Sequence, residues 1–228
     1  MQTNIAKNIE NIKQQILSTC KTANRDPEKI TLVAVSKKKS HEMIQIAHKV
    51  GINNFGENYA QELKEKASII GLKNIIWHFI GPIQSNKVKI IAENANWVHA
   101  VYREKIIRKL DLECGQLNKT INACIQVNIS SEESKSGCSP KDLTDVAKLV
   151  ESMKNINLRG IMALPKITNN RIEQEKAMRS VISLSKKLQS SFPHAKCVSL
   201  GTTHDFTDAL IHGSTMLRIG ESIFGKRK

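Results

Sequence analysis

The first helix and the first strand can be predicted from the spacing of apolar side chains. Isoleucine recurs at helical spacing near the N-terminus, at Ile5, Ile9, Ile12 and Ile16. This spacing predicts an amphipathic helix over residues 4–23. An Asp-Pro pair at 26–27 interrupts the pattern before residues 32–35, a short apolar run rich in β-branched side chains. Such a run is typical of a buried strand.

The same cycle of apolar runs and helical patterns continues along the chain. Further strands are predicted at residues 53–56, 75–80, 97–101, 123–129, 158–164, 197–200 and 215–219. Helical patterns lie between them, at 41–50, 59–70, 83–93, 103–117 and 172–188. With the first run this makes about eight strands, which is the number that a parallel eight-membered barrel of this length requires. We therefore predict an α/β fold, a single (β/α)8 TIM-type barrel with an extra N-terminal helix.

One domain is expected to span residues 1–228, because no linker or low-complexity stretch interrupts the cycle. A doubly wound open sheet is the alternative fold, since alternation alone does not prove that a sheet closes. Ser139, Pro140 and Asp142 also predict a helix start, with a Ser cap, Pro at the first helical position and an acid in the first turn.

Polar residues and glycines follow the predicted strands where their carboxyl ends would meet. They include Lys37, Asn58, Asn128, Gly201, Thr203 and Glu221, and His78 and Met162 stand close to the ends of the third and sixth strands. In barrels of this type the functional residues come from the loops at the carboxyl ends of the strands. We therefore expect the site to lie on this rim.

Lys37 is the first candidate, because it ends a buried apolar strand. Crowding by Lys38 and Lys39, together with partial burial, would favour the unprotonated, nucleophilic form of its amine. A solvent-exposed surface lysine is the ordinary alternative. Strand alternation does not distinguish Lys37 from Lys39, so either could be the reactive amine on spacing alone.

The loops after the last two strands form the second candidate. Barrel enzymes often bind phosphate with these loops and a short helix that follows. Gly201, Thr203 and Gly220 offer backbone N–H groups, a hydroxyl and room for close approach, ahead of a short predicted helix at 221–224. The alternative is that the glycines only make turns.

Arg218 is the third candidate, since it stands within an apolar strand. A buried guanidinium is costly without a partner. It either forms a structural salt bridge, for which Glu57 and Asp205 are the candidate acids, or donates hydrogen bonds to an acceptor on a ligand.

Composition removes several classes of protein. The chain lacks an N-terminal apolar segment of the secretory type and any apolar run near the roughly 20 residues that span a bilayer. Its five cysteines are scattered, without a C-x-x-C pair, which favours reduced thiols in the cytoplasm and no metal site. The net charge of +14 is spread along the chain and aromatics are only 4%, so we expect no specific nucleic-acid binding and no membrane partner.

Four ordered motifs make the sequence recognisable. They are LVAVSK (32–37), FGENYAQE (55–62), WHFIGPIQSNK (77–87) and RIGESIFG (218–225), and the segment 128–137 fits with them. Together they closely resemble the pyridoxal phosphate homeostasis protein family, and the resemblance covers nearly the whole chain. It implies a barrel like the N-terminal domain of alanine racemase.

The resemblance also implies a cofactor and its site. Pyridoxal 5′-phosphate (PLP) would form a covalent aldimine with Lys37, and Arg218 would face the pyridine nitrogen. The phosphate would lie around Thr203 and Gly220. The implied cofactor-binding residues are Lys37, Asn58, His78, Met162, Ser199, Gly201, Thr203, Arg218, Gly220 and Glu221.

Two segments depart from the family pattern. Where the family usually has Ser-Met-Gly-Met-Ser-x-Asp, this chain has SLGTTHD over residues 199–205, so Thr203 supplies the hydroxyl. Where the family usually has Val-Asp, the chain has Val101 and Tyr102, which leaves the role of that loop open.

The resemblance implies a protein that stores, buffers or delivers PLP inside the cell without catalysis. Its expected partners are PLP, amino acids and PLP-dependent apo-enzymes, and it would be a monomer or weak homodimer in the cytoplasm. An amino-acid racemase is the main alternative. Racemases of this fold take a second base from a separate C-terminal domain, which is not expected here, and neither Tyr59 nor Tyr102 stands in a motif typical of that base. A basic nucleic-acid-binding protein is the weaker alternative.

Overall fold

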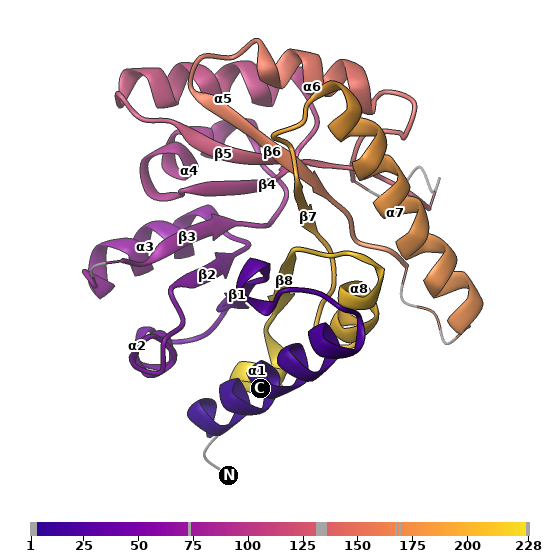
Figure 1. The fold of residues 1–228 in the computed structure, drawn as a ribbon. Coiled ribbons are helices and arrows are strands. Elements are labelled where there is room, and N and C mark those ends of the chain that lie inside the picture. Colours follow the sequence, from indigo (N-terminus) through magenta and orange to yellow (C-terminus); the bar gives the residue numbers. More distant parts are fainter. Residues whose placement is uncertain (1–3, 73, 131–135, 167, 169, 227–228) are drawn as a thin grey trace.

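Parallel strands close into a barrel in this protein. The structure, a computed structural model, describes residues 4–72, 74–130, 136–166, 168 and 170–226. Each strand from β1 to β8 pairs in parallel with the next along the chain, and β8 pairs with β1 (Figure 1). The predicted (β/α)8 barrel is therefore confirmed, and the open doubly wound sheet is excluded.

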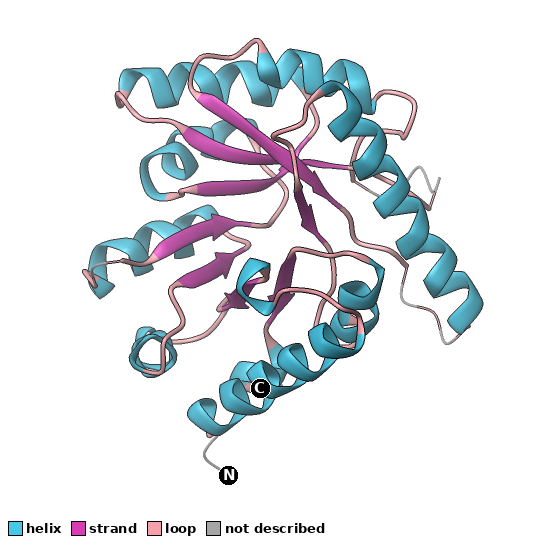
Figure 2. Cartoon of the chain, in the orientation of Figure 1, coloured by secondary structure: helices cyan, strands magenta, loops and turns pink. Residues whose placement is uncertain are grey.

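Strands and helices alternate along the described chain (Figure 2). The strands are β1 (Thr31–Val35), β2 (Asn54–Glu57), β3 (Ile76–Phe79), β4 (Trp97–Val101), β5 (Ile121–Gln126), β6 (Ile156–Met162), β7 (Cys197–Ser199) and β8 (Met216–Ile219). The α-helices are α1 (Ile5–Thr22), α2 (His41–Lys49), α3 (Ala60–Ile70), α4 (Val88–Asn94), α5 (Glu104–Gln116), α6 (Leu143–Glu151), α7 (Arg171–Ser191), α8 (Phe206–His212) and α9 (Glu221–Phe224). Two 3₁₀ helices are η1 (Pro27–Lys29) and η2 (Ser85–Lys87).

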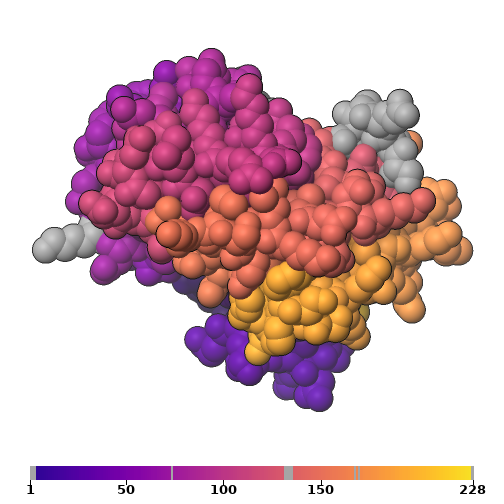
Figure 3. Space-filling view, turned by 90° about the horizontal axis from the view of Figure 1, so that it is seen from above, coloured from indigo at the N-terminus to yellow at the C-terminus, as the bar shows by residue number. Residues whose placement is uncertain are grey.

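The extra N-terminal helix α1 packs against helices from the C-terminal part of the chain. Its isoleucine face is buried, as the helical spacing predicts. The helix packs against α8 and α9 from the other end of the sequence. In the space-filling view a violet surface from the early part of the chain adjoins a golden surface from its late part (Figure 3). Burial of this apolar face contributes on the order of 1.5–3 kcal/mol for each isoleucine.

Two apolar clusters divide the strand residues by the direction in which they point. In β6, Ile161 and Ala163 next to it belong to the large cluster that includes the helices, whereas Met162 packs with Ala100 and Cys124 in a smaller cluster. Because side chains alternate across a strand, the smaller cluster fills the inside of the barrel. The barrel interior is therefore a packed core that supports the rim from below.

Several predicted boundaries are wrong. The helix predicted over 83–93 is η2 followed by α4, which begins at Val88, and the strand predicted over 158–164 is β6, Ile156–Met162. The strand predicted over 123–129 is β5, Ile121–Gln126, which begins and ends earlier. The helix predicted to start at Ser139 begins at Leu143, because Ser139 and Asp142 instead bond to each other. The Ser139 Oγ donates to Asp142 Oδ2 at 2.7 Å, which closes a turn ahead of the helix.

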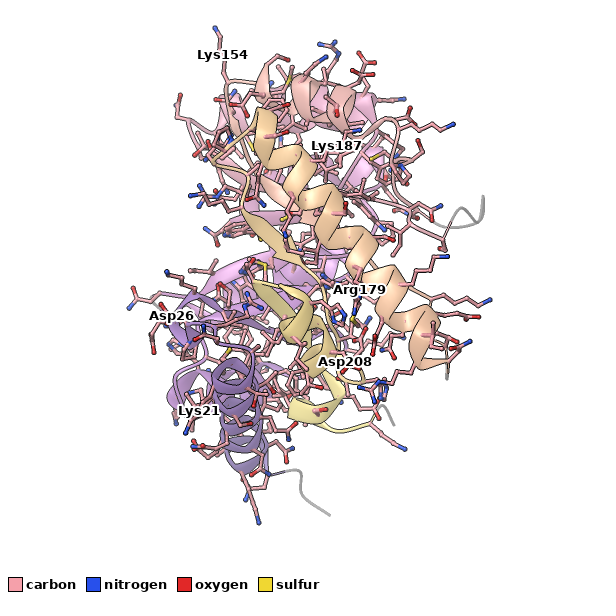
Figure 4. The ribbon with its side chains drawn as sticks, turned by 45° about the vertical axis from the view of Figure 1, so that its right-hand side comes forward. Lys21, Asp26, Lys154, Arg179, Lys187 and Asp208 are labelled. Atoms are coloured by element: carbon pink, nitrogen blue, oxygen red, sulfur yellow. The ribbon has the colours of Figure 1, made fainter. Side chains whose placement is uncertain are left out.

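Charged side chains are spread over the surface of the molecule. Lys21 on α1, Lys154 after α6, and Arg179 and Lys187 on α7 project into solvent at separate places, with the acids Asp26 and Asp208 nearby (Figure 4). Basic and acidic side chains are both present among these labelled positions. Among the described residues, no helix is long and apolar enough to cross a membrane, and no group of three His, Cys, Asp or Glu side chains could hold a metal.

Candidate cofactor site

Two adjacent hollows open at the carboxyl ends of the strands. The small hollow, of about 230 Å³, is lined by Val35, Lys37, Asn58, Ile80, Leu164, Thr202, Thr203, His204, Arg218, Gly220 and Glu221. The large hollow, of about 610 Å³, shares Asn58, Ile80, Leu164, Thr202 and Arg218 with it. These shared residues make the two hollows one site on the predicted rim.

The three consecutive lysines after β1 have three different environments. Lys37 lines the small hollow. Lys38 is exposed, has a positive φ of 57°, and lies over the Tyr59 ring. Lys39 donates to the carbonyls of residues 224, 225 and 226, at 3.0–3.3 Å, and so joins its loop to the end of α9. Of the three lysines, only Lys37 lines one of the two hollows of the rim.

A buried ionic cluster fixes the loop that carries Lys37. The Lys66 ammonium from α3 donates to Ser36 O at 2.7 Å, to Glu57 Oε1 at 2.8 Å and to Glu62 Oε1 at 2.7 Å. The Ser36 hydroxyl also donates to Glu57 Oε1, and Glu62 accepts from the backbone N–H of Lys38, both at 2.5 Å. Residues on both sides of Lys37 are therefore tied to α3 and β2.

The Glu57 carboxyl in this cluster is fully buried, but its partners bond to only one of its two oxygens. Its side chain is fully buried, and its Oε2 has no hydrogen-bond partner among the described residues. Burial raises the pKa of Glu57 to about 7, against the opposing effect of the Lys66 charge. The Glu57 carboxyl therefore titrates near neutral pH.

The raised pKa of Glu57 predicts a pH-dependent stability. The folded protein holds this proton up to about pH 7, whereas the unfolded chain releases it near pH 4.5, so folding stability falls as pH rises between these values. The free energy of unfolding of the wild type, minus that of Glu57→Gln, should decrease by about 3 kcal/mol from pH 4.5 to 8. Urea unfolding at several pH values measures this difference. An exposed control, Glu104→Gln, should show no such trend, and a flat difference for Glu57→Gln would contradict the assignment.

The loop after β7 is shaped by a glycine and an aspartate. Gly201 has a φ of +95°, and a Cβ there would lie 2.7 Å from the Ala209 Cβ, so a side chain would strain both the backbone and α8. Asp205 Oδ1 accepts from the backbone N–H and the hydroxyl of Thr202, at 2.6 and 3.0 Å. The turn brings Thr203 to the small hollow, beside Gly220 and Glu221 from the loop after β8.

Arg218 reaches both hollows from inside the barrel. One Nη donates to the Ser199 hydroxyl, and the other donates to Ala163 O at 3.0 Å. Neither acid considered for a salt bridge takes this role, because Glu57 pairs with Lys66 and Asp205 bonds Thr202. Burial lowers the pKa of Arg218 to about 10, which still leaves it cationic at neutral pH. The site therefore contains a buried cation with donors to spare.

Asn58 supplies an acceptor at the same place. It lines both hollows, and its Oδ1 is buried without a hydrogen-bond partner among the described residues. A buried acceptor left unpaired costs about 1–3 kcal/mol, so a donor on a ligand would relieve a real penalty. The site thus combines an amine, a cation, a hydroxyl and an unsatisfied amide oxygen.

Three of the residues predicted to bind the cofactor lie deeper than the hollows. His78, Met162 and Ser199 are buried in the barrel interior and line neither hollow. His78 bonds Asn54 and His99, Met162 packs in the smaller apolar cluster, and Ser199 bonds Arg218 and His99. The other predicted residues, which are Lys37, Asn58, Gly201, Thr203, Arg218, Gly220 and Glu221, line one or both hollows.

Several residues that shape the site had no clear signal in the sequence. Lys66 and Glu62 form the cluster behind Lys37, but on a helix they look like ordinary surface charges spaced four apart. Tyr102, at the departure after β4, packs against the large apolar cluster with Arg103 over its ring. In segment 128–137, Asn128 lines the large hollow, whereas 131–135 lie outside the described residues.

The chain is similar to one family over its whole length. The family model for the alanine racemase N-terminal domain matches residues 3–228. A pyridoxal phosphate homeostasis protein of Haemophilus influenzae is 41% identical over 98% of this chain and 96% of its own. The protein of the same name from Escherichia coli K12 is 38% identical over 98% and 97%.

Solved structures show the same fold. PipY of Synechococcus elongatus with PLP bound has a TM-score of 0.86 and is 27% identical, over 97% of this chain and all of its own. Alanine racemase of Clostridium difficile has a TM-score of 0.82 at 15% identity, over 98% of this chain and 57% of its own. The second likeness shows the fold alone, because this chain spans little more than half of the racemase.

Proposed function

Since the chain belongs to the alanine racemase N-terminal domain family, and within it to the pyridoxal phosphate homeostasis proteins, we propose that it binds PLP covalently through Lys37 and serves PLP homeostasis in the cytoplasm. The observation that carries the proposal is that Lys37, Thr203 and Arg218 line one hollow of about 230 Å³. These three side chains offer an amine, a hydroxyl and a cation, each of which has a matching group on PLP.

The residues of the hollow fit this cofactor. PLP supplies an aldehyde, which condenses with a lysine amine to a Schiff base with loss of water. The ionic cluster of Glu57, Glu62 and Lys66 holds the backbone around Lys37, so the amine extends from a fixed loop. The unpaired Asn58 Oδ1 would accept from a donor on the ligand or on a bound water.

Polar groups of the hollow divide between the two ends of the cofactor. Thr203 and the backbone at Gly220 and Glu221 would bind the phosphate, since N–H and O–H donors and a glycine that allows close approach suit a dianion. Arg218 would face the ring nitrogen. Because a guanidinium only donates, it would keep that nitrogen as an unprotonated acceptor.

This arrangement favours a carrier over an enzyme. A PLP enzyme that stabilises a carbanion uses the cofactor as an electron sink, and the sink is strongest when the ring nitrogen is protonated. Arg218 opposes that protonation. The protein would therefore hold PLP, allow an amino acid to take the place of the Lys37 amine at the aldehyde with release of that amine, and deliver PLP to apo-enzymes without turnover.

Thr203 provides a test of the phosphate site. Thr203→Ala removes one donor to a dianion, and charge-assisted hydrogen bonds are worth roughly 1.5–3 kcal/mol, so the affinity for PLP should fall about tenfold or more. Pyridoxal without phosphate should bind almost unchanged. Thr203→Ser keeps the hydroxyl and should retain most of the affinity. Equal losses for PLP and pyridoxal, measured by titration of the visible band, would show that Thr203 does not contact the phosphate.

A further inference from the structure

A line of polar side chains, all buried except the half-buried Asn54, crosses the interior of the barrel below the cofactor site. His78 Nε2 lies 2.9 Å from Asn54 Oδ1, and His78 Nδ1 lies 3.0 Å from His99 Nε2. His99 Nδ1 lies 2.9 Å from Ser199 Oγ, which also accepts from Arg218. The line joins β2, β3, β4, β7 and β8, and it ends at the guanidinium that reaches both hollows.

The chemistry of the two ends determines the direction of every hydrogen bond in the line. Arg218 only donates, so Ser199 Oγ accepts from it and its own hydroxyl hydrogen is left for His99 Nδ1. His99 then carries its proton on Nε2 and donates to His78 Nδ1. His78 in turn carries its proton on Nε2 and donates to the Asn54 carbonyl oxygen. The acceptor at the far end is the type of group that this direction requires.

Burial keeps both imidazoles in the neutral form that the line needs. His78 and His99 are fully buried. Burial lowers the pKa of His78 to about 3, and burial together with His78 and Arg218 lowers the pKa of His99 well below its usual range. A neutral imidazole has one donor and one acceptor, and the line uses both on each ring.

We propose that Ser199, His99, His78 and Asn54 form a one-directional hydrogen-bond chain that positions Arg218 as a donor toward the ring nitrogen of the bound cofactor. The proposal rests on the proposed function, because it names the residues that orient one group of that site. With its Nη atoms held by Ser199 and Ala163 O, the guanidinium has its plane fixed at the place where Arg218 lines both hollows. The residues of this hydrogen-bond chain are positioning residues, since none of them lines either hollow of the cofactor site.

The alternative is that the chain only satisfies buried polar groups of the barrel core. In that case the removal of one member lowers stability and leaves the state of the bound cofactor unchanged. In a positioning chain the same removal alters the protonation of the ring nitrogen. The two roles therefore differ in a spectroscopic property that stability alone does not move.

The first experiment uses the protein without PLP. With ¹⁵N-labelled histidine, nuclear magnetic resonance assigns the protonated nitrogen of each imidazole at neutral pH. We expect neutral Nε2–H rings for both His78 and His99. A cationic ring, or an Nδ1–H ring at either position, would contradict the proposed hydrogen-bond chain. This measurement holds whether or not PLP binds.

The second experiment uses the PLP-loaded protein and follows the ¹⁵N resonance of a labelled pyridine nitrogen. Ser199→Ala removes the contact with Arg218, whereas His99→Asn keeps a polar group near Ser199 and removes the link to His78. The protonation equilibrium of the ring nitrogen should shift toward the protonated form by about tenfold in Ser199→Ala, or one pH unit, and by less in His99→Asn. Val150→Ala, a buried change in α6, controls for lost stability, and His194→Gln, an exposed histidine, controls for lost imidazole.

The outcomes separate the two proposals. If the variants lose stability as Val150→Ala does and the ring nitrogen is unchanged, the chain is only structural and the positioning role is wrong. If Ser199→Ala fails to fold, His99→Asn decides the question by the same shift. If the wild type takes up no PLP, the proposed function fails and the positioning role fails with it. The histidine resonances then still decide whether the hydrogen-bond chain exists.

Discussion

Replacing Lys37 by alanine is expected to abolish the visible Schiff-base absorption of the PLP-loaded protein and its labelling by borohydride. Lys37 lines the small hollow with Thr203 and Arg218, and no other lysine lines that hollow among the described residues. Without its amine the small hollow offers the aldehyde no lysine, so we expect the covalent complex to be lost. Absorption spectra and intact mass after borohydride reduction measure both effects.

The neighbouring lysines are matched controls for this result. Lys38→Ala removes an exposed side chain and should change neither signal. Lys39→Ala removes donors to the carbonyls at the end of α9, which costs roughly 1–2 kcal/mol of stability but no labelling. Loss of labelling in Lys39→Ala, together with its retention in Lys37→Ala, would contradict the assignment of Lys37.

Amino acids are expected to react with the PLP-loaded protein, shift its spectrum and remain unracemised. Racemisation requires an acid–base group on each face of the substrate. Lys37 supplies one face, and neither of the chain's two tyrosines lines a hollow, since Tyr59 is exposed and Tyr102 packs on the core. Arg218 also weakens the electron sink. Turnover should therefore lie far below the range of about 1–10³ s⁻¹ that is usual for enzymes.

Long incubation with L-alanine and D-alanine, followed by chiral chromatography, measures this turnover. Racemisation at about 1 s⁻¹ or faster would overturn the carrier proposal in favour of the enzyme. In that event His204, which lines the small hollow and is exposed, is the first group to replace, and His204→Ala would then have to lose the activity. A slow exchange of the α-proton that keeps the configuration agrees with a single base.

The barrel and the rim could be predicted from the sequence because both depend on local patterns. Strand-like runs separated by helical periods gave β1 to β8 within a few residues, and α9 lies where the 221–224 segment predicts it. The failures occur where a side chain had a choice of partner. Ser139 was expected to cap a helix, but its hydroxyl bonds the Asp142 carboxylate and the helix begins later.

The depth of a residue below the rim could not be predicted from the sequence. His78 and Met162 belong to strands whose ends reach the site, and strand alternation places them inside the barrel. Alternation does not say how far inside, because that depends on the stagger of each strand against its neighbours. Both residues therefore lie in the packed interior instead of the hollows. His99 was missed for the same reason, since its partners come from β3 and β7.

Lys37, Lys38 and Lys39 show a second limit of prediction from the sequence. Alternation left Lys37 and Lys39 equivalent, because both would point to the same side of an extended strand. The chain leaves the extended conformation at this point, with a positive φ at Lys38, and Lys39 is drawn to the end of α9. The partner that separates the two lysines lies 186 residues away in the sequence, so local spacing could not reveal it.

The most direct test of the central claim is to locate the reduced lysine in the wild-type protein. The purified protein is saturated with PLP, reduced with borohydride, digested and mapped by mass spectrometry. We predict a single stoichiometric pyridoxyl-lysine at Lys37. An unmodified Lys37, with the label on Lys39, on scattered surface lysines or nowhere, would contradict the account.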